Sequence, residues 1–346
     1  MPKKRSELKR SARMHLTGKY GTALLVVVIA SLIRNALSVT RSAVMNWIPA
    51  FKIFSALSDF FTADALTNLN VNTWLAAIRE IIEKIGANAR FYILFFAISL
   101  LVEWLFSLLI SNVVVCGMQR WFLRADYPQW TPTVGMMFTP FSSGQYRLVV
   151  TGMFWKNLWL FIWSLPQLVF SFLVSAPSLL LMYHVLLSGS PVTPGFIRRI
   201  ASLYGLPEFI FQWPWLTAMS VLLLVSAIVL INRSYRYRMT EMILADNPMI
   251  GARRVLDLSK KMTQRSVWRM IFLDLSFIGW ALLCIVFYFV SWLGFLLLTP
   301  YYTATWIEAY RDLRDEAVRR GDVTMEELGY RRIEIPHTDA APFFTS

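Results

Sequence analysis

Charged side chains within long apolar segments are the residues of this sequence best placed to do chemistry. Glu103 lies in SLLVEWLF, Lys156 in MFWKNLW and Asp274 in IFLDLSF. A charge near the centre of a bilayer costs about 2.5–3.5 kcal/mol on insertion scales, so such a group usually faces a bundle interior, a partner or water. These three residues are therefore the candidates for an intramembrane polar path. Arg34 and Glu308 also lie in apolar segments, but near the segment ends, where side chains reach headgroup water.

Glu103 is the most deeply placed of these charges. It follows the start of its apolar segment by about 12 residues, which corresponds to about 18 Å of helix. We therefore expect Glu103 to be the best candidate for a proton or cation site. Asp274 and Lys156 lie nearer the inner ends of their segments, at comparable depth. Two alternatives remain open for them: they face each other as a buried pair, or each separately reaches headgroup water.

The residues that known enzyme and metal centres need are scarce. The histidines are His15, His184 and His337, and they form neither HExxH nor an i, i+4 pair. The phosphate-binding pattern GxxxxGK[ST] is absent, and Cys116 and Cys284 both lie in apolar segments, where a thiol behaves as a small hydrophobe. We expect no catalytic residues, no metal site and no cofactor, and so a protein that is not an enzyme.

The composition defines the class of fold that must position these groups. The chain has 346 residues, of which 56% are hydrophobic and 16% charged, and its mean hydropathy is +0.50. An ordinary soluble domain is about a quarter charged. The apolar residues gather in stretches of about 20, the length that crosses a hydrocarbon core of about 30 Å. The sequence therefore predicts an all-α polytopic membrane protein and excludes soluble, disordered and disulfide-rich secreted classes.

Six apolar segments are expected to cross the membrane. Most of the 34 Lys and Arg residues lie in the connections that share a side with the N-terminus, which predicts that both termini are cytosolic. The third segment contains Pro166 and Pro177 and is long enough for a hairpin. A hairpin would place the most basic connection outside, so one kinked helix is favoured. The first segment is read as a retained helix, not a signal peptide. The expected spans are about 20–37, 91–118, 149–187, 214–231, 267–290 and 293–310.

Three amphipathic segments outside these spans are expected to lie on the membrane surface. The sequence predicts a basic helix on the inner leaflet at residues 1–19, a helix on the outer surface at about 73–85, and an inner interfacial helix at about 248–263. The tail at 311–346 is expected in the cytosol. The inner helix is expected to contact anionic lipid headgroups through basic residues, namely Arg253, Arg254, Lys260 and Lys261. The net charge of +13 is explained by topology, so no nucleic-acid partner is expected.

Several motifs resemble one family of bacterial membrane proteins. They are the aromatic-basic turn Tyr235 to Tyr237, ADNP at Ala245 to Pro248, Ser259-Lys260, LSFIGW at Leu275 to Trp280, and TPYY at Thr299 to Tyr302. The start RSELKRSARMHLTGKYG, Arg5 to Gly21, is similar too. Together they resemble domain-of-unknown-function family 975. The resemblance implies a multi-pass protein of the bacterial cytoplasmic membrane with no established activity, and it supplies no catalytic residues.

Two functions from different classes fit these features. Abundant basic and amphipathic surface beside few core polar groups favours a non-catalytic membrane scaffold, assembly factor or envelope-homeostasis component, with anionic membrane lipids as partners. The alternative is a small-solute or ion transporter that uses Glu103, Asp274 and Lys156. An intramembrane lipid-modifying enzyme is a weaker third possibility, because no nucleophile, base and metal set is present. Whether Glu103 opens onto a polar cavity or is sealed by packing discriminates between scaffold and transporter.

Overall fold

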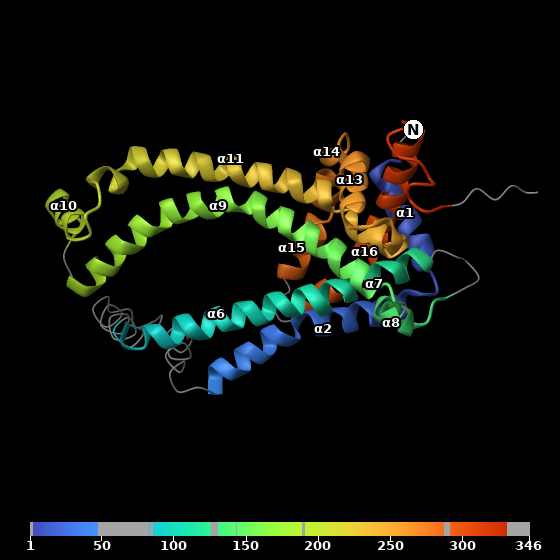
Figure 1. Cartoon of the computed structure of the whole chain (residues 1–346), viewed down its shortest axis with the longest axis horizontal. Coiled ribbons are helices and arrows are strands. Elements are labelled where there is room, and N and C mark those ends of the chain that lie inside the picture. Colours follow the sequence, from blue (N-terminus) through green and yellow to red (C-terminus); the bar gives the residue numbers. More distant parts are fainter. Residues whose placement is uncertain are drawn as a thin grey trace, which may run out of the picture.

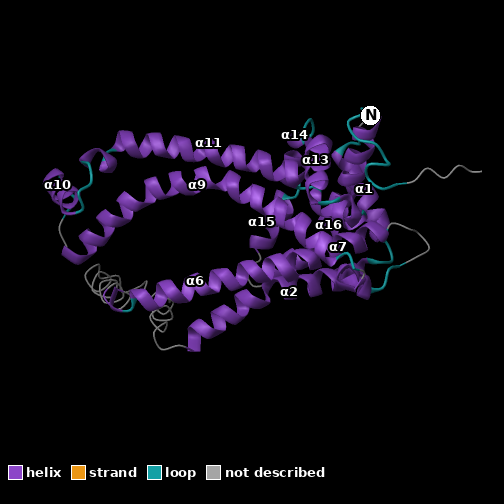
Figure 2. Cartoon of the chain, viewed as in Figure 1, coloured by secondary structure: helices purple, strands orange, loops and turns teal. Residues whose placement is uncertain are grey.

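The computed structural model describes residues 3–47, 83, 86–125, 131–142, 144–188, 191–286 and 291–330. Within these ranges the chain forms helices and no strand (Figure 2). The first half contains α1 (Arg5–Leu16), α2 (Tyr20–Trp47), α6 (Ala89–Phe106), the π-helix η2 (Ser107–Ser111), α7 (Asn112–Arg124), the 3-10 helix η3 (Val134–Phe138), α8 (Thr139–Ser142) and α9 (Tyr146–Ser188). The second half contains α10 (Pro194–Leu203), η4 (Glu208–Phe211), α11 (Trp213–Tyr237), α12 (Thr240–Asp246), η5 (Pro248–Ile250), α13 (Ala252–Thr263), α14 (Val267–Leu275), α15 (Ile278–Val286) and α16 (Ser291–Arg319).

Five helical segments among the described residues are long and apolar enough to cross a membrane, so the chain is an all-α membrane protein. They are Tyr20–Ser42, Ala89–Arg124, Tyr146–Leu186, Trp213–Asp246 and Val267–Cys284. The expected sixth span, 293–310, is not among them. It forms the first part of α16, where Pro300 and a run of Tyr and Thr residues follow the apolar start. Several of these polar residues, including Thr303 and Thr305, are buried in protein.

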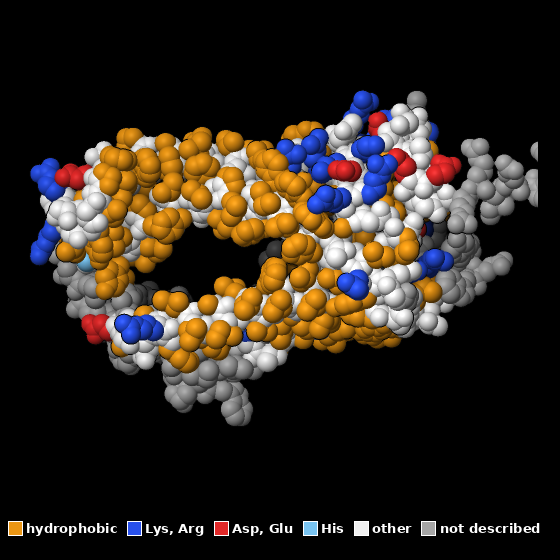
Figure 3. Space-filling view, in the orientation of Figure 1, with side chains coloured by type: hydrophobic (Ala, Val, Ile, Leu, Met, Phe, Trp, Pro, Cys, Tyr) orange, Lys and Arg blue, Asp and Glu red, His pale blue; other side chains and the backbone are white. Residues whose placement is uncertain are grey.

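The molecule has two parts (Figure 1). At one end α1, α7, α12, α13 and the second half of α16 form a compact cluster of helices, here called the head. From the head, α2 with α6 and α9 with α11 extend as two pairs that separate beyond the head, and α9 then curves back toward the far end of α6 (Figure 1). The space-filling view shows an opening between the pairs, walled by hydrophobic side chains, whereas charged side chains gather over the head (Figure 3).

The hydrophobic core lies in the head. Its largest fully buried side chains include Trp121, Met137, Leu258, Trp306 and Tyr310. The spans bury far less: no residue in the most apolar window of Ala89–Arg124 is buried inside the protein, and the highest share in any span is 22%. Burial of apolar side chains therefore stabilises the head, and the spans present their apolar surface to lipid.

The amphipathic helices at both ends of the sequence pack on protein. In α1 the buried stripe Leu8, Ala12 and Leu16 lies against α16. In α13 the apolar face packs on α9, α11, α12 and α16, with Val255 and Met262 fully buried. Both segments form helices with one apolar face, as their periodicity predicts. These apolar faces, however, cover the core of the head. The predicted helix at about 73–85 lies outside the described residues, apart from Glu83, as does the end of the tail, 331–346.

The start of the inner amphipathic helix is built in two steps. Asn247 caps the short helix η5, accepting a hydrogen bond from the Met249 amide at 3.0 Å, and Pro248 opens η5. Gly251 then adopts φ +86°, a conformation that favours glycine, and α13 begins after it. The side-chain cap at Asn247 thus belongs to η5 and not to α13.

The chain after α16 folds back onto the head. Leu328 accepts a hydrogen bond from Asn247 at 3.2 Å, and Arg254 pairs with Glu327. The hydroxyl of Tyr330 donates to Asp246, and burial raises the pKa of Tyr330 to about 12, so this donor stays protonated throughout the neutral range.

The longest span is one continuous helix, whereas the fifth span is divided into two helices. Pro166 and Pro177 lie inside one continuous helix, α9, which curves along its length (Figure 1). The fifth span, by contrast, is interrupted between α14 and α15. There the Ser276 hydroxyl donates to the Leu273 carbonyl oxygen at 2.5 Å and competes with the helix hydrogen bonds. The α14–α15 segment therefore turns shortly after Asp274.

A close crossing in the head gives a test of this packing. An ideal Cβ on Gly117 of α7 would lie 1.7 Å from the Met137 carbonyl oxygen in η3, whereas a Cβ on Gly135 would meet nothing within 4 Å. We expect Gly117→Ala to lower the free energy of unfolding by about 1–3 kcal/mol, because backbone must move. Thermal unfolding in detergent, followed by tryptophan fluorescence, measures the change. Gly135→Ala is the control, and equal midpoints for the two variants would contradict the crossing.

Candidate functional site

Asp274 lies at the junction of the head and the spans, where four donors surround its carboxylate. Its Oδ2 accepts hydrogen bonds from the Tyr235 hydroxyl at 2.6 Å and from Arg238 Nη1 at 3.1 Å. Its Oδ1 accepts from the Tyr302 hydroxyl at 2.9 Å and from Trp306 Nε1 at 3.0 Å. The carboxylate thus joins α14 to α11 and α16. With every strong acceptor position used, Asp274 is a positioning residue.

The group that Asp274 positions is the guanidinium of Arg238. This guanidinium stacks 3.6 Å from the centroid of the Trp306 ring and also bonds the Tyr302 hydroxyl. Arg238 directly follows α11, and two cavities share it as a lining residue. The ion pair therefore holds a cation at a fixed place between these cavities.

Lys156 of α9 pairs with Glu241 of α12, not with Asp274. Of the two alternatives left open for Lys156 and Asp274, the buried pair with each other is therefore wrong. Its reason lies in the length of the fourth span: apolar residues were expected to end near Ile231, but helix continues through α11 and α12 to Asp246. This extension carries Glu241 alongside α9. The Lys156 side chain is only 11% exposed, so a nearby carboxylate is needed to stabilise its charge.

Two adjoining cavities meet at these ion pairs and form what we call the polar chamber. They measure about 580 and 560 Å³. One extends along α9 and α11, the other along α2, α6 and α7. The wall between them consists of residues that line both, namely Gln119, Arg238, Glu241, Tyr302 and Thr303. Glu103 lines the second cavity and Lys156 the first, so the structure brings these two predicted residues to one chamber, with Asp274 behind Arg238.

The second cavity follows the second span through its π-helix. Its lining includes Ser107 and Ser111 of η2 and Asn112, the first residue of α7. A π-helix widens the backbone by one residue, and such insertions are frequent at functional sites. From Glu103 to Gln119 the lining residues extend over about 24 Å of helix. The cavity is therefore elongated along the span.

Glu103 opens onto this cavity and has a basic partner. Arg41 Nη1 lies 2.7 Å from Glu103 Oε1, and both side chains are 31% exposed. The first span was expected to end near Leu37, but α2 continues to Trp47 and brings Arg41 within reach. Arg41 already supplies the positive charge that a bound cation would bring to this carboxylate.

Amide side chains line the chamber without partners. Gln119 is 8% exposed, and its Oε1 has no hydrogen-bond partner. Asn112 Nδ2 in the second cavity and Gln167 Oε1 in the first also have no hydrogen-bond partner. A buried amide without a partner is costly, most of all in a membrane span. A search restricted to charged residues misses these amides, although Asn and Gln inside an apolar segment are themselves a signal.

A fourth cation faces the second cavity without an ion-pair partner of its own. Arg34 of α2 lines it, and among the described residues no acidic group lies within ion-pair distance of Arg34. Arg41, Lys156 and Arg238 are each neutralised by one carboxylate. The chamber therefore has one uncompensated positive charge beside hydrogen-bonding groups of both kinds, which suits a polar solute that carries an anionic group.

A family model described as "Protein of unknown function (DUF975)" matches residues 131–317. The chain belongs to this family. No curated protein and no solved structure matches it. The matched region contains Lys156, Arg238, Glu241 and Asp274, so the chamber wall formed by α9, α11, α12 and α16 is part of the DUF975 region. The wall formed by α2, α6 and α7 precedes it.

In this DUF975 protein, the residues predicted to meet lipid headgroups lie on the side of α13 that faces away from the core. Arg253 stacks 5.1 Å from the Trp155 ring, Arg254 pairs with Glu327, and Lys260 lies 3.2 Å from Asp257. Lys261 is exposed. Their contact with lipid stays a prediction. In the described part of the chain, no group of three or more His, Cys, Asp or Glu residues could hold a metal.

Exchanging charges tests the ion-pair assignment. We expect Lys156→Glu and Glu241→Lys each to lower the free energy of unfolding, toward the lower end of the about 3–5 kcal/mol reported for breaking buried pairs. The double exchange should restore most of this loss, because it re-forms the pair. The measurement is folded yield and the thermal unfolding midpoint in detergent. The matched control exchanges Lys156→Asp with Asp274→Lys, and rescue by this control instead would contradict the assignment.

Proposed function

We propose that this protein binds a small polar solute with an anionic group in the polar chamber and carries it across the membrane. The observation that supports this most is Gln119, which is nine-tenths buried, has an unpartnered acceptor atom and lines both cavities. The wall between the cavities is where a solute would pass from one helix pair to the other. The proposed activity is transport without covalent catalysis.

The charges of the chamber support a bound anion. Arg34 supplies an uncompensated cation, and Asn112 supplies an unpartnered N–H donor in the same cavity. Gln119 and Gln167 supply acceptors toward donor groups of the solute. Inside the low-dielectric spans these interactions are stronger than in water, so a few groups suffice for binding.

The arrangement of the helix pairs supports movement of a solute. The pair α9 with α11 and the pair α2 with α6 meet at the head, and an opening separates them beyond it (Figures 1 and 3). The spans are lightly packed and η2 interrupts the regular helix of one wall. Two loosely joined pairs around a polar site form an arrangement that can rock about that site.

The sequence favoured a scaffold function because its amphipathic segments could lie on the membrane surface. In the structure, however, the apolar faces of α1 and α13 are buried in the head. This favours transport over the scaffold. For the location, we propose the bacterial cytoplasmic membrane with the head at its cytosolic surface. Both α1 and the end of α16 belong to the head, together with most of the charged side chains in view (Figure 3).

Water access to the chamber is the first test. In a variant without Cys116 and Cys284, we expect Ser107→Cys to react with a charged, membrane-impermeant thiol reagent at least tenfold faster than Leu109→Cys. Both residues belong to η2, but Ser107 lines the cavity and Leu109 does not, although it is 41% exposed. Mass spectrometry of detergent-free nanodisc samples gives the rates. Equal labelling at both positions would show that no aqueous chamber exists.

Uptake into proteoliposomes is the second test. The probes are labelled glutamate, inorganic phosphate and glycine betaine, which represent a carboxylate, a phosphate and a zwitterion. We expect uptake of at least one probe above that of protein-free vesicles. Arg34→Gln should reduce this uptake about tenfold, because the uncompensated cation is lost.

The matched control for this assay is Arg198→Gln. Arg198 is 74% exposed and pairs with Glu208 at the far end of the molecule, so its removal should leave uptake unchanged. Absence of uptake for all three probes, or uptake that is insensitive to Arg34→Gln, counts against the proposed function.

A further inference from the structure

A further cavity lies outside the polar chamber, between the head and α14. A cleft of about 770 Å³ separates the start of the chain and α1 from α14. Its charged lining is entirely basic: Lys3, Lys4, Arg5, Lys9 and Arg269. Its floor is apolar and includes Leu8, Met270, Leu273 and Leu313. The cleft thus combines a cationic rim with a hydrophobic base.

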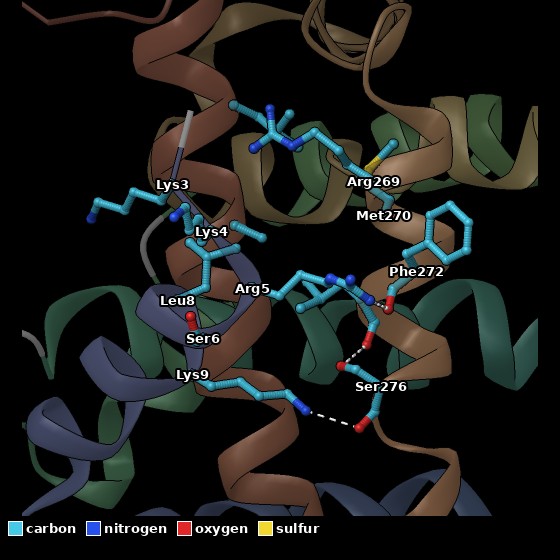
Figure 4. Close-up of a pocket in the computed structure, with 13 residues that line it drawn as sticks. Lys3, Lys4, Arg5, Ser6, Leu8, Lys9, Arg269, Met270, Phe272 and Ser276 are labelled. Atoms are coloured by element: carbon cyan, nitrogen blue, oxygen red, sulfur yellow. Dashed lines mark hydrogen bonds between the residues drawn. The ribbon is translucent and has the colours of Figure 1, made fainter. Parts of the chain in front are cut away.

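Two of these cations reach across the cleft to α14 (Figure 4). Arg5 Nη1 donates to the Phe272 carbonyl oxygen at 3.4 Å, and Lys9 Nζ donates to the Ser276 carbonyl oxygen at 2.9 Å. Lys9 also lies 4.1 Å from the centroid of the Phe277 ring. None of these partners carries a full negative charge.

The acidic groups near the cleft are already engaged elsewhere. Asp312 and Glu316 of α16 both pair with Arg269, at 2.5 and 2.6 Å. Glu308 pairs with Arg311 at 2.9 Å and lies 3.7 Å from Lys3, whose side chain points away from the cleft (Figure 4). Glu7 accepts the backbone N–H of Lys4. Among the described residues, no carboxylate lies within ion-pair distance of the Lys4, Arg5 and Lys9 side chains.

These cations lie at the level of a membrane span. Lys9 meets Ser276, nine residues after the start of α14, which corresponds to about 13 Å of helix. Alongside, Trp268 is 72% exposed, Phe272 49% and Leu275 46%, as expected of side chains that face lipid. A cation at this depth without a counter-charge is costly.

We propose that the cleft between α1 and α14 binds one anionic phospholipid. The lipid phosphate would lie between Arg5, Lys9 and Lys4, and an acyl chain would follow the apolar floor toward the exposed face of α14. The lipid thereby supplies the negative charge that the protein lacks at this depth. This site does not depend on the proposed transport function.

The surroundings of Lys9 also favour a nearby anion. Burial lowers its pKa, and the neighbouring charges of Arg13 and Arg5 lower it further. A phosphate next to the ammonium would oppose both effects. A span that ends in a basic helix beside exposed aromatic residues is also where anionic headgroups gather.

Retention of lipid by the full chain tests the proposal. The protein is exchanged into micelles with equal amounts of phosphatidylglycerol and phosphatidylcholine, and bound lipid is counted by native mass spectrometry. We expect the wild type to retain phosphatidylglycerol preferentially. The double variant Arg5→Gln/Lys9→Gln should bind it about thirtyfold more weakly, since each cation contributes about fivefold.

Two further variants separate charge from folding. Arg5→Lys/Lys9→Arg keeps both charges and should retain the lipid. Arg198→Gln/Arg199→Gln removes two charges from α10, at the far end of the molecule, and should leave retention unchanged. Equal retention of the two lipids by the wild type, or the same loss in the α10 variant, overturns the proposal.

Inorganic phosphate distinguishes a lipid from a soluble anion. At millimolar concentration it should not displace phosphatidylglycerol, because it lacks the acyl chain that fills the apolar floor. Displacement by phosphate alone would show that the cleft takes a soluble anion and would overturn the assignment to lipid.

Discussion

The ion pair between Arg238 and Asp274 is the interaction on which the rest of this structure depends. It lies where the head meets the spans, and its donors come from α11 and α16 while its carboxylate comes from α14. A buried pair is tolerated only when its remaining hydrogen-bonding positions are filled. Tyr235, Tyr302 and Trp306 fill them, and Trp306 also stacks on the guanidinium. The pair therefore fixes three helices together and fixes a cation beside the chamber.

The helices on the two sides of this junction, in the head and in the spans, are stabilised in different ways. In the head, large side chains such as Trp121 and Met262 are fully buried, so packing and the hydrophobic effect hold the helices. In the spans little surface is buried within the protein, and apolar contact with lipid replaces it. A tightly packed membrane bundle has no room for a cavity at its centre. Two helix pairs that are joined firmly at one end and loosely beyond it leave that room.

Much of the fold could be predicted from the sequence, because hydropathy and length determine where a helix can cross a bilayer. The deep charges Glu103 and Lys156 could be recognised as cavity residues for the same reason. Their partners could not. Arg41 and Glu241 lie beyond the ends of the predicted spans, and only the continuation of helix past these ends brings them into contact. Helical periodicity in α13 predicted an apolar face, but the same pattern fits a lipid surface and a protein core.

The unpartnered amides show why the chamber is more than a defect in packing. Ion pairs such as Lys156 with Glu241 have a sufficient structural explanation, since they hold neighbouring helices together. Asn112, Gln119 and Gln167 hold nothing together through their unpartnered atoms, and leucine at these positions would be more stable in a span. Empty cavities in proteins are usually apolar, whereas polar ones contain water or a ligand. Amides that line a cavity and lack partners are therefore best explained by what enters it, and the nearby Arg34 selects for negative charge.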